Sequence, residues 1–181
     1  MKKTIILVLL LCIVAMCCVY ADNASIKVQV SPYSLQTINA TGGKYFSKYG
    51  YGANLGFRYK VWNNLTAGLD ISLSVYDYAE LSDLDADYSV TGFRAVAGYS
   101  YEFVPKFYGE AELSFGVDIR EIAEQSMGTF GLDLYLGAGY RINDEFAVTA
   151  GAAGGIGFQV GKKAKSTDFC VKTRVGLQAE L

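Results

Sequence analysis

The 181-residue sequence has no histidine, so it lacks the side chain that most often performs acid–base catalysis near neutral pH. It has four cysteines, but three of them lie before residue 22. After that point Cys170 is alone, so residues 22–181 cannot form an internal disulfide. After the N-terminal region no apolar run reaches about eighteen residues, which excludes a transmembrane helix. An excess of positive charge is also missing. There are 16 basic and 18 acidic residues, which argues against nucleic acid as a partner.

The N-terminus has the features of a secretory signal peptide. Lys2 and Lys3 provide a positive start, Ile5 to Val14 is apolar, and the small residue Ala21 ends a cleavage pattern. We therefore expect residues 1–21 to be removed as a signal peptide.

Residues 22–181 have the size of one domain. A lipoprotein acylated at Cys17 is an alternative, but Met16 stands where a small residue is needed.

The stretch from Tyr49 to Val75 shows the pattern on which the rest of the chain is built. Apolar and polar or small residues alternate strictly from Tyr49 to Val61, and the alternation resumes from Leu65 to Val75 after a short turn. This pattern predicts two antiparallel strands joined by a tight turn. Each strand exceeds the roughly 9–11 residues that cross a bilayer at a tilt.

The same alternation predicts eight strands in all. Their ranges are 25–33, 49–61, 65–75, 92–103, 107–119, 130–142, 146–160 and 169–181. The first has the weakest pattern because Pro32 cannot donate to a strand ladder.

The predicted connections alternate in length. Those around residues 62–64, 104–105 and 143–144 are short, whereas 34–48, 77–87, 120–127 and 161–168 are several times longer. Short periplasmic turns and long outer loops are typical of outer-membrane barrels. We therefore predict an all-β protein, an eight-stranded antiparallel up-and-down transmembrane β-barrel in the cell outer membrane, with periplasmic termini.

A soluble barrel with an apolar lumen is the competing interpretation, because alternation alone does not say which face points inward. The polar faces are rich in glycine and poor in lysine, which suits a crowded interior, and aromatic residues gather near the strand ends. The C-terminal segment also has the form of a barrel insertion signal, with a polar residue, then glycine, then two apolar residues. These are Arg174, Gly176, Ala179 and Leu181.

With these features the chain resembles the small eight-stranded bacterial outer-membrane barrels, such as the OmpA transmembrane domain, OmpX and OmpW. It departs from their pattern at Leu181, where an aromatic residue is usual. The resemblance implies the outer-membrane insertion machinery as a partner. Enzymes on this architecture would be expected to use a histidine, which this chain lacks.

The inward faces carry charges that we expect to form a lumenal charge network. Its members are Arg58, Asp70, Arg94, Glu110, Glu112, Asp133, Arg141, Lys172 and Arg174, and counting along the strands places Lys60, Glu102 and Glu180 in its lower band with Arg58, Glu110 and Arg141. Glu110 and Glu112 share a face, as a paired-acid site requires, but pairing with lumenal arginines is the favoured interpretation because so narrow a barrel is filled by side chains. On that basis, Arg174→Ala is expected to leave a buried acid unpaired.

Two outer loops carry charge of one sign. Asp83, Asp85 and Asp87 have the first spacings of a calcium loop, but Tyr88 replaces its glycine, so we expect a solvated acidic loop. In the last loop, Lys162, Lys163 and Lys165 either meet lipopolysaccharide phosphates or form a solubilising tip.

The sequence therefore predicts a non-enzymatic outer-membrane barrel with a structural or surface-interaction role, no cofactor and no metal site. Its expected partners are outer-membrane lipid and lipopolysaccharide, while an external partner cannot be named. The alternative is a narrow channel or a ligand-binding barrel for small solutes or hydrophobic molecules. That alternative comes from the glycine- and alanine-lined wall that the sixth and seventh segments would form.

Overall fold

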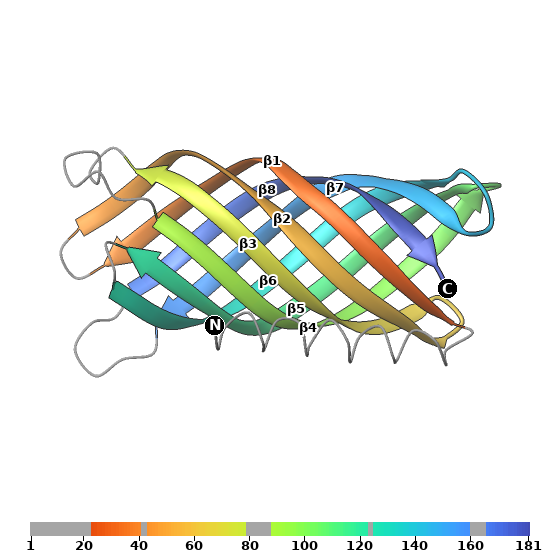
Figure 1. The fold of residues 1–181 in the computed structure, drawn as a ribbon, viewed down its shortest axis with the longest axis horizontal. Coiled ribbons are helices and arrows are strands. Elements are labelled where there is room, and N and C mark those ends of the chain that lie inside the picture. The colour runs from red at the N-terminus through yellow and green to blue at the C-terminus, as the bar shows by residue number, and fades with distance from the viewer. Residues whose placement is uncertain (1–22, 41–42, 79–87, 123–124, 160–165) are drawn as a thin grey trace, which may run out of the picture.

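The computed structural model describes residues 23–40, 43–78, 88–122, 125–159 and 166–181 (Figure 1). These residues form eight strands. They are β1 (Ala24–Ala40), β2 (Gly43–Trp62), β3 (Leu65–Tyr78), β4 (Tyr88–Val104), β5 (Phe107–Ile122), β6 (Gln125–Arg141), β7 (Phe146–Gln159) and β8 (Ser166–Glu180).

The strands form a closed barrel in which each is antiparallel to its neighbours. Closure is made by β1 and β8, whose pairing runs from Ser25↔Glu180 to Ala40↔Ser166. This arrangement confirms the predicted all-β, eight-stranded up-and-down architecture. None of the described residues belongs to a helix that is long and apolar enough to cross a membrane.

The two ends of the barrel differ. Three short turns, β2–β3, β4–β5 and β6–β7, lie at the same end as the start of β1 and the finish of β8, and we call this the turn end (Figure 1). The opposite end, where β1, β3, β5 and β7 finish, is the loop end. Within the described ranges, the non-glycine residues with positive φ lie in these turns; they are Asn63 at 42° and Lys106 at 71°.

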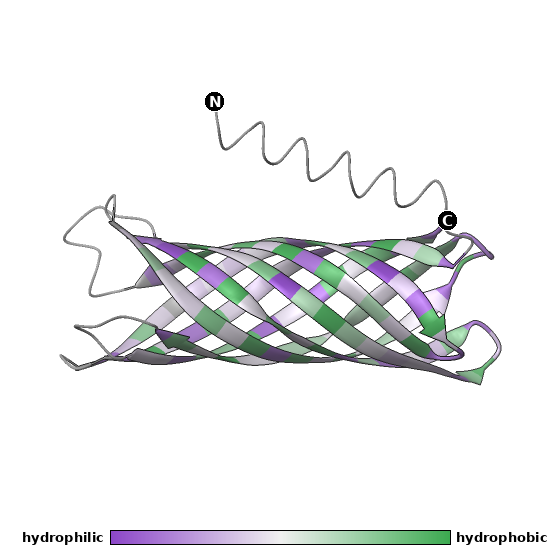
Figure 2. Ribbon diagram, turned by 90° about the horizontal axis from the view of Figure 1, so that it is seen from below, coloured by the Kyte–Doolittle hydropathy of each residue, from purple (hydrophilic) through white to green (hydrophobic). Residues whose placement is uncertain are grey.

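Hydrophilic and hydrophobic residues alternate along the strands (Figure 2), and exposure shows that the two sets point to opposite faces of the barrel. On β5 and β6 the outward Leu113 and Leu134 are each 48% exposed, whereas the inward Ser114 and Asp133 are buried. The outer face is thus apolar along the strands and the lumen is polar. This is the distribution expected of a barrel surrounded by lipid, where every backbone group is paired within the closed sheet.

Two of the four predicted long loops are wrong. Residues 34–48 lie almost wholly in β1 and β2, which leaves only residues 41–42 between these strands. Residues 120–127 likewise lie mostly in β5 and β6. At the first site the reason is a bulge at Pro32, where the pairing moves from Ser31↔Gly52 to Ser34↔Gly50. The extra residue shifts the phase of alternation, so a continuing strand has the pattern of a loop.

Several sequence predictions fall outside the described residues. These concern the signal peptide at 1–21, Asp83, Asp85 and Asp87 in the 79–87 connection, and Lys162, Lys163 and Lys165 in the 160–165 connection.

Candidate functional site

The lumen holds equal numbers of buried acidic and basic side chains within the described part of the chain. The basic ones are Lys27, Arg58, Arg94, Arg120, Lys172 and Arg174, and the acidic ones are Asp70, Glu110, Glu112, Asp118, Asp133 and Asp168. A buried charge is costly unless an opposite charge or hydrogen bonds compensate it. The arrangement of these side chains therefore decides whether the lumen is open or filled.

The first cluster lies toward the turn end, and we call it the turn-end layer. Lys27 Nζ is 2.8 Å from Glu110 Oε2 and 3.4 Å from Glu112 Oε1. Arg58 donates to both oxygens of Glu112 at 2.9 Å and, through Nη1, to Asp70 Oδ1 at 2.5 Å. These five residues come from β1, β2, β3 and β5, so their contacts cross the lumen.

The second cluster is the central layer. Arg94 donates to Asp118 through Nε at 3.2 Å and Nη2 at 2.6 Å, and it also forms an ion pair with Asp133. Arg174 Nη2 lies 3.8 Å from the same Asp133 carboxylate. Lys172, two residues from Arg174 on β8, donates to Ser74 Oγ at 3.4 Å.

Tyr135 fills the space between the two layers. Lys27 Nζ lies 4.7 Å from its ring centroid and Arg174 Cζ lies 5.6 Å from it, distances typical of cation–π contacts. The ring fits because Gly137 and Gly151 have no side chain: a Cβ on Gly151 would stand 2.8 Å from Tyr135 Cε2. The glycine-rich wall of β6 and β7 therefore accommodates a large lumenal side chain.

Toward the loop end the lumen holds a further ion pair and an aromatic cluster. Arg120 Nη2 is 2.5 Å from Asp168 Oδ2, which also accepts a hydrogen bond from Gln36 at 2.9 Å. Beside this pair, the rings of Tyr76 and Tyr88 lie 6.0 Å apart and pack with Val90, Ile38 and Tyr45.

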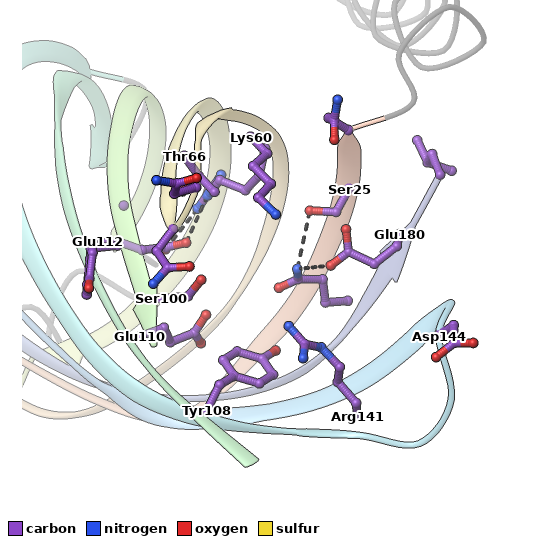
Figure 3. A pocket seen from close by; sticks show the side chains of 18 residues that line it. Ser25, Lys60, Thr66, Ser100, Tyr108, Glu110, Glu112, Arg141, Asp144 and Glu180 are labelled. Carbon is purple, nitrogen blue, oxygen red and sulfur yellow. Dashed lines mark hydrogen bonds and ion pairs between the residues drawn. The ribbon is translucent and has the colours of Figure 1, made fainter. Parts of the chain in front are cut away.

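The turn end is open. A cavity of about 420 Å³ lies there between the ends of the strands (Figure 3), and we call it the turn-end cavity. Its floor is formed by Glu110, Glu112 and Arg58 of the turn-end layer, and its sides include Tyr108 and Lys60.

The predicted network residues fall into three groups. Arg58, Asp70, Glu110 and Glu112 meet in the turn-end layer, and Arg94, Asp133, Lys172 and Arg174 lie in the central layer. Arg141 lies outside the buried network, because it pairs with Glu102 at the turn end with their side chains 45% and 41% exposed. Lys60 and Glu180 are also exposed, so the lower band predicted from the sequence is only partly buried.

Sequence reasoning left four buried charges out of the network: Lys27, Asp118, Arg120 and Asp168. Lys27 and Asp118 stand on the polar faces of their predicted strands, so alternation alone was sufficient to place them inward. Arg120 and Asp168 fall in stretches that were predicted as loops, so their inward direction was hidden.

The four residues of the predicted insertion signal lie on or just after β8. Arg174 points into the lumen and Leu181 follows the strand end. Gly176 faces inward beside Gln29, where a Cβ would stand 2.6 Å from Gln29 Cγ. Ala179 pairs with Ile26 and Phe146. Their role in insertion stays a prediction.

The lumenal carboxylates of the described residues form ion pairs with lysine and arginine and are not grouped as the ligands of a metal ion would be. Glu110 is paired with Lys27, and Glu112 with Arg58 and Lys27. Among the described residues no three side chains of histidine, cysteine, aspartate or glutamate are grouped as a metal site.

The family described as "Outer membrane protein beta-barrel domain" matches residues 5–175 of the chain. Among solved structures, neisserial surface protein A is similar at 14% identity with a TM-score of 0.60, covering 87% of this chain and 97% of that one. OprG of Pseudomonas aeruginosa is similar at 12% identity, with a TM-score of 0.52 and coverage of 88% and 96%. The outer membrane protease OmpT of Escherichia coli is similar at 10% identity, with a TM-score of 0.50 and coverage of 90% and 98%. No curated protein sequence matches the chain. Identities this low are evidence of a shared fold only.

Proposed function

Since the chain belongs to the outer membrane protein beta-barrel domain family, we propose that it is a non-enzymatic outer-membrane barrel with a structural or surface-interaction role. In this proposal side chains fill the lumen, so the barrel serves as a support, and the loop end is the part that contacts other molecules. Fold alone does not decide function on this architecture, because the same barrel hosts unrelated activities.

The observation that carries the proposal is the filled lumen. Arg58 and Glu112 join β2 to β5 across the interior, Tyr135 occupies the space beyond them, and Arg94 with Asp133 and Asp118 follows. An ion or solute passing through would have to separate pairs that are buried from water. Breaking such a pair is strongly unfavourable.

A catalytic role is disfavoured by the chemistry of the lumen. OmpT is a protease with a similar fold, but the likeness to it is one of fold only. This sequence has no histidine to act as base, and the carboxylates that share a face, Glu110 and Glu112, each accept from a cation.

For the orientation, we propose that the turn end faces the periplasm and the loop end faces outward, as short turns and longer loops are arranged in such barrels. The outer end would then carry the acidic 79–87 and the lysine-containing 160–165 connections. Lipopolysaccharide phosphates are the proposed contact of the lysines, and residues 1–21 are the proposed export signal.

The second candidate is a ligand-binding barrel, and it is supported by the turn-end cavity. This cavity stops at the turn-end layer, so it supports binding at one mouth rather than passage through the barrel.

Solute leakage from liposomes tests the proposal. Liposomes that contain the refolded protein and enclose a small ionic dye should lose the dye no faster than empty liposomes. Rapid loss that scales with the amount of inserted protein would overturn the filled-support role and favour a conduit.

A further inference from the structure

Two bulges lie in the neighbouring strands β1 and β2, toward the loop end. Around Pro32, β1 has one residue more than either of its neighbours, β2 and β8. Around Lys48, β2 likewise has one residue more than either β1 or β3. A bulge interrupts the hydrogen-bond ladder and bends its strand, and proline also lacks a backbone donor. Both strands are therefore interrupted at nearby positions, and on both of their sides.

Beyond the bulges, residues 35–40 of β1 and 43–47 of β2 form a short hairpin, which we call the β1–β2 tip. One edge of the tip is joined to β8 by regular pairing from Leu35↔Val171 to Ala40↔Ser166. At the other edge, Ser47↔Tyr78 is the last pair that β2 makes with β3 within the described ranges. The described part of the sheet thus attaches the tip along one side, and the bulges separate it from the rest of its own strands.

The inner face of the tip lies on the aromatic cluster of the loop end. Ile38 and Tyr45 pack against Tyr76, Tyr88 and Val90. The three cluster residues are each 6% exposed or less, whereas Ile38 and Tyr45 are only partly buried. The apolar contact that holds the tip down is therefore smaller than that of a fully buried element.

The hydrogen bonds of Gln36 are compatible with movement of the tip. Its backbone N–H donates to Ser47 Oγ at 2.7 Å, within the tip, and its side chain donates to Asp168 Oδ2 of β8 at 2.9 Å. A rotation of the tip about its β8 edge keeps both partners beside Gln36. The same rotation breaks the Ser47↔Tyr78 pair and lifts Tyr45 from the cluster.

We propose that the β1–β2 tip is a hinged lid, which turns about its β8 edge and uncovers Tyr76, Tyr88 and Val90 at the loop end. The bulges at Pro32 and Lys48 are the hinge, because they let the tip turn without moving the rest of β1 and β2. Elements that move are drawn from parts of a fold with few buried contacts, and the tip is such a part. This lid goes beyond the proposed function, which requires no moving part.

NMR relaxation dispersion on the refolded protein in detergent micelles tests the lid, because lids open on the μs–ms timescale that this method detects. The amide signals of Tyr45 in the tip and Val90 beneath it should show exchange with one common rate. Glu121 and Ser126 are the control residues. They lie in the β5–β6 hairpin at the same end, which pairs regularly up to Ile122↔Gln125, so their amides should show no such exchange.

A disulfide across the free edge locks the lid. Ser47→Cys and Tyr78→Cys, made with Cys170→Ser, place two cysteines opposite each other in the β2–β3 pairing, at a separation that a disulfide spans. Oxidation should abolish the exchange at Tyr45 and Val90, and reduction should restore it.

Two alanine variants separate the lid from general mobility of a strand end. Tyr45→Ala removes a contact with the cluster and should raise the population of the open state about tenfold or more. Phe46→Ala is the matched control, because Phe46 is the next residue, faces outward and is 53% exposed. It should change that population less than about twofold.

Three results would overturn the lid. The first is the absence of exchange at Tyr45 and Val90 in both the wild type and Tyr45→Ala. The second is exchange that persists in the oxidised double-cysteine variant. The third is an equal effect of Phe46→Ala and Tyr45→Ala on the open population. If the disulfide does not form, the comparison of the two alanine variants decides.

Discussion

Arg58 and Glu112 form a two-pronged ion pair across the barrel, with Nε donating to Oε1 and Nη2 donating to Oε2, both at 2.9 Å. Their strands, β2 and β5, are not neighbours in the sheet, so this contact crosses the interior. Both side chains are shielded, with 3% and 7% of their surface exposed. The geometry matches the planar fork of arginine to the two oxygens of a carboxylate.

The first prediction concerns this pair. Arg58→Ala leaves Asp70 and Glu112 buried with only Lys27 nearby, so it should lower the free energy of unfolding by about 3–5 kcal/mol. Arg58→Lys keeps the charge but loses the two-pronged hydrogen bonding, so its free energy of unfolding should lie between those of Arg58→Ala and the wild type. Urea unfolding of the refolded protein in detergent gives these values.

Arg141→Ala is the matched control for Arg58→Ala. Its partner Glu102 is about half exposed, so the loss should be only about 0–1 kcal/mol. Equal losses in the two variants would mean that water reaches Arg58 as freely as Arg141, in contradiction to a filled lumen.

The second prediction revises the expectation for Arg174. The structure gives Asp133 a second cation, Arg94, so Arg174→Ala does not leave this acid alone. We expect a loss of about 2 kcal/mol, on the order of a desolvated cation–π contact to Tyr135 and smaller than the loss in Arg58→Ala. The same unfolding series measures it, and a loss as large as that of Arg58→Ala would show that Arg94 does not compensate Asp133.

The third prediction tests whether lumenal glycines make room for tyrosines. At Gly139 the three nearest atoms to an added Cβ all belong to Tyr108, with Cε1 at 2.5 Å. Gly139→Ala should therefore cost about 1–3 kcal/mol through overpacking. On a Tyr108→Ala background it should cost at least about 1 kcal/mol less, because the obstacle is gone.

Gly154→Ala is the control for this series. Gly154 faces outward with nothing within 4 Å of an added Cβ, so the substitution should change stability by less than about 1 kcal/mol and in the stabilising direction. Additive effects of Gly139→Ala and Tyr108→Ala would refute the proposed contact.

The architecture was predictable from the sequence because period-two alternation and turn spacing are local signals. Segments such as Leu65–Val75 show the inward and outward faces directly, and the closed barrel confirms them. The extent of β1 was not predictable, because the bulge at Pro32 reverses the phase within one strand.

Pairing within the lumen was beyond sequence reasoning for a different reason. Alternation gives direction, but the depth of a side chain depends on strand tilt and stagger, which set neighbours across the barrel. Thus Lys27, on the first strand, meets Glu110 and Glu112 on the fifth. The position of Arg141 was missed for the same reason. Its side chain lies at the turn end beside Glu102 rather than in the buried network beside Glu110.

The fourth prediction concerns orientation. With Cys170 replaced by serine, Asn64→Cys in the β2–β3 turn should resist a membrane-impermeant thiol reagent in intact cells and react once the outer membrane is permeabilised. Lys44→Cys, exposed at the loop end, should react in intact cells. Asn64 is preferred to Asn63, whose φ of 42° suits asparagine better than cysteine. The reverse labelling pattern would place the turn end outside.

Single-channel recording tests the central claim, a lumen filled by paired charges, most directly. Wild-type protein inserted in a planar bilayer should give no unitary conductance steps, because Arg58, Glu112 and Tyr135 occupy the path. Recovery of the protein with floated liposomes shows that it inserts, so that an absence of steps is not an absence of protein. An Arg58→Ala, Glu112→Ala, Tyr135→Ala variant removes only the part of the obstruction near the turn end, so it too should give no steps while Arg94, Asp118 and Asp133 fill the central layer. Discrete, reproducible steps from the wild-type protein would contradict the account.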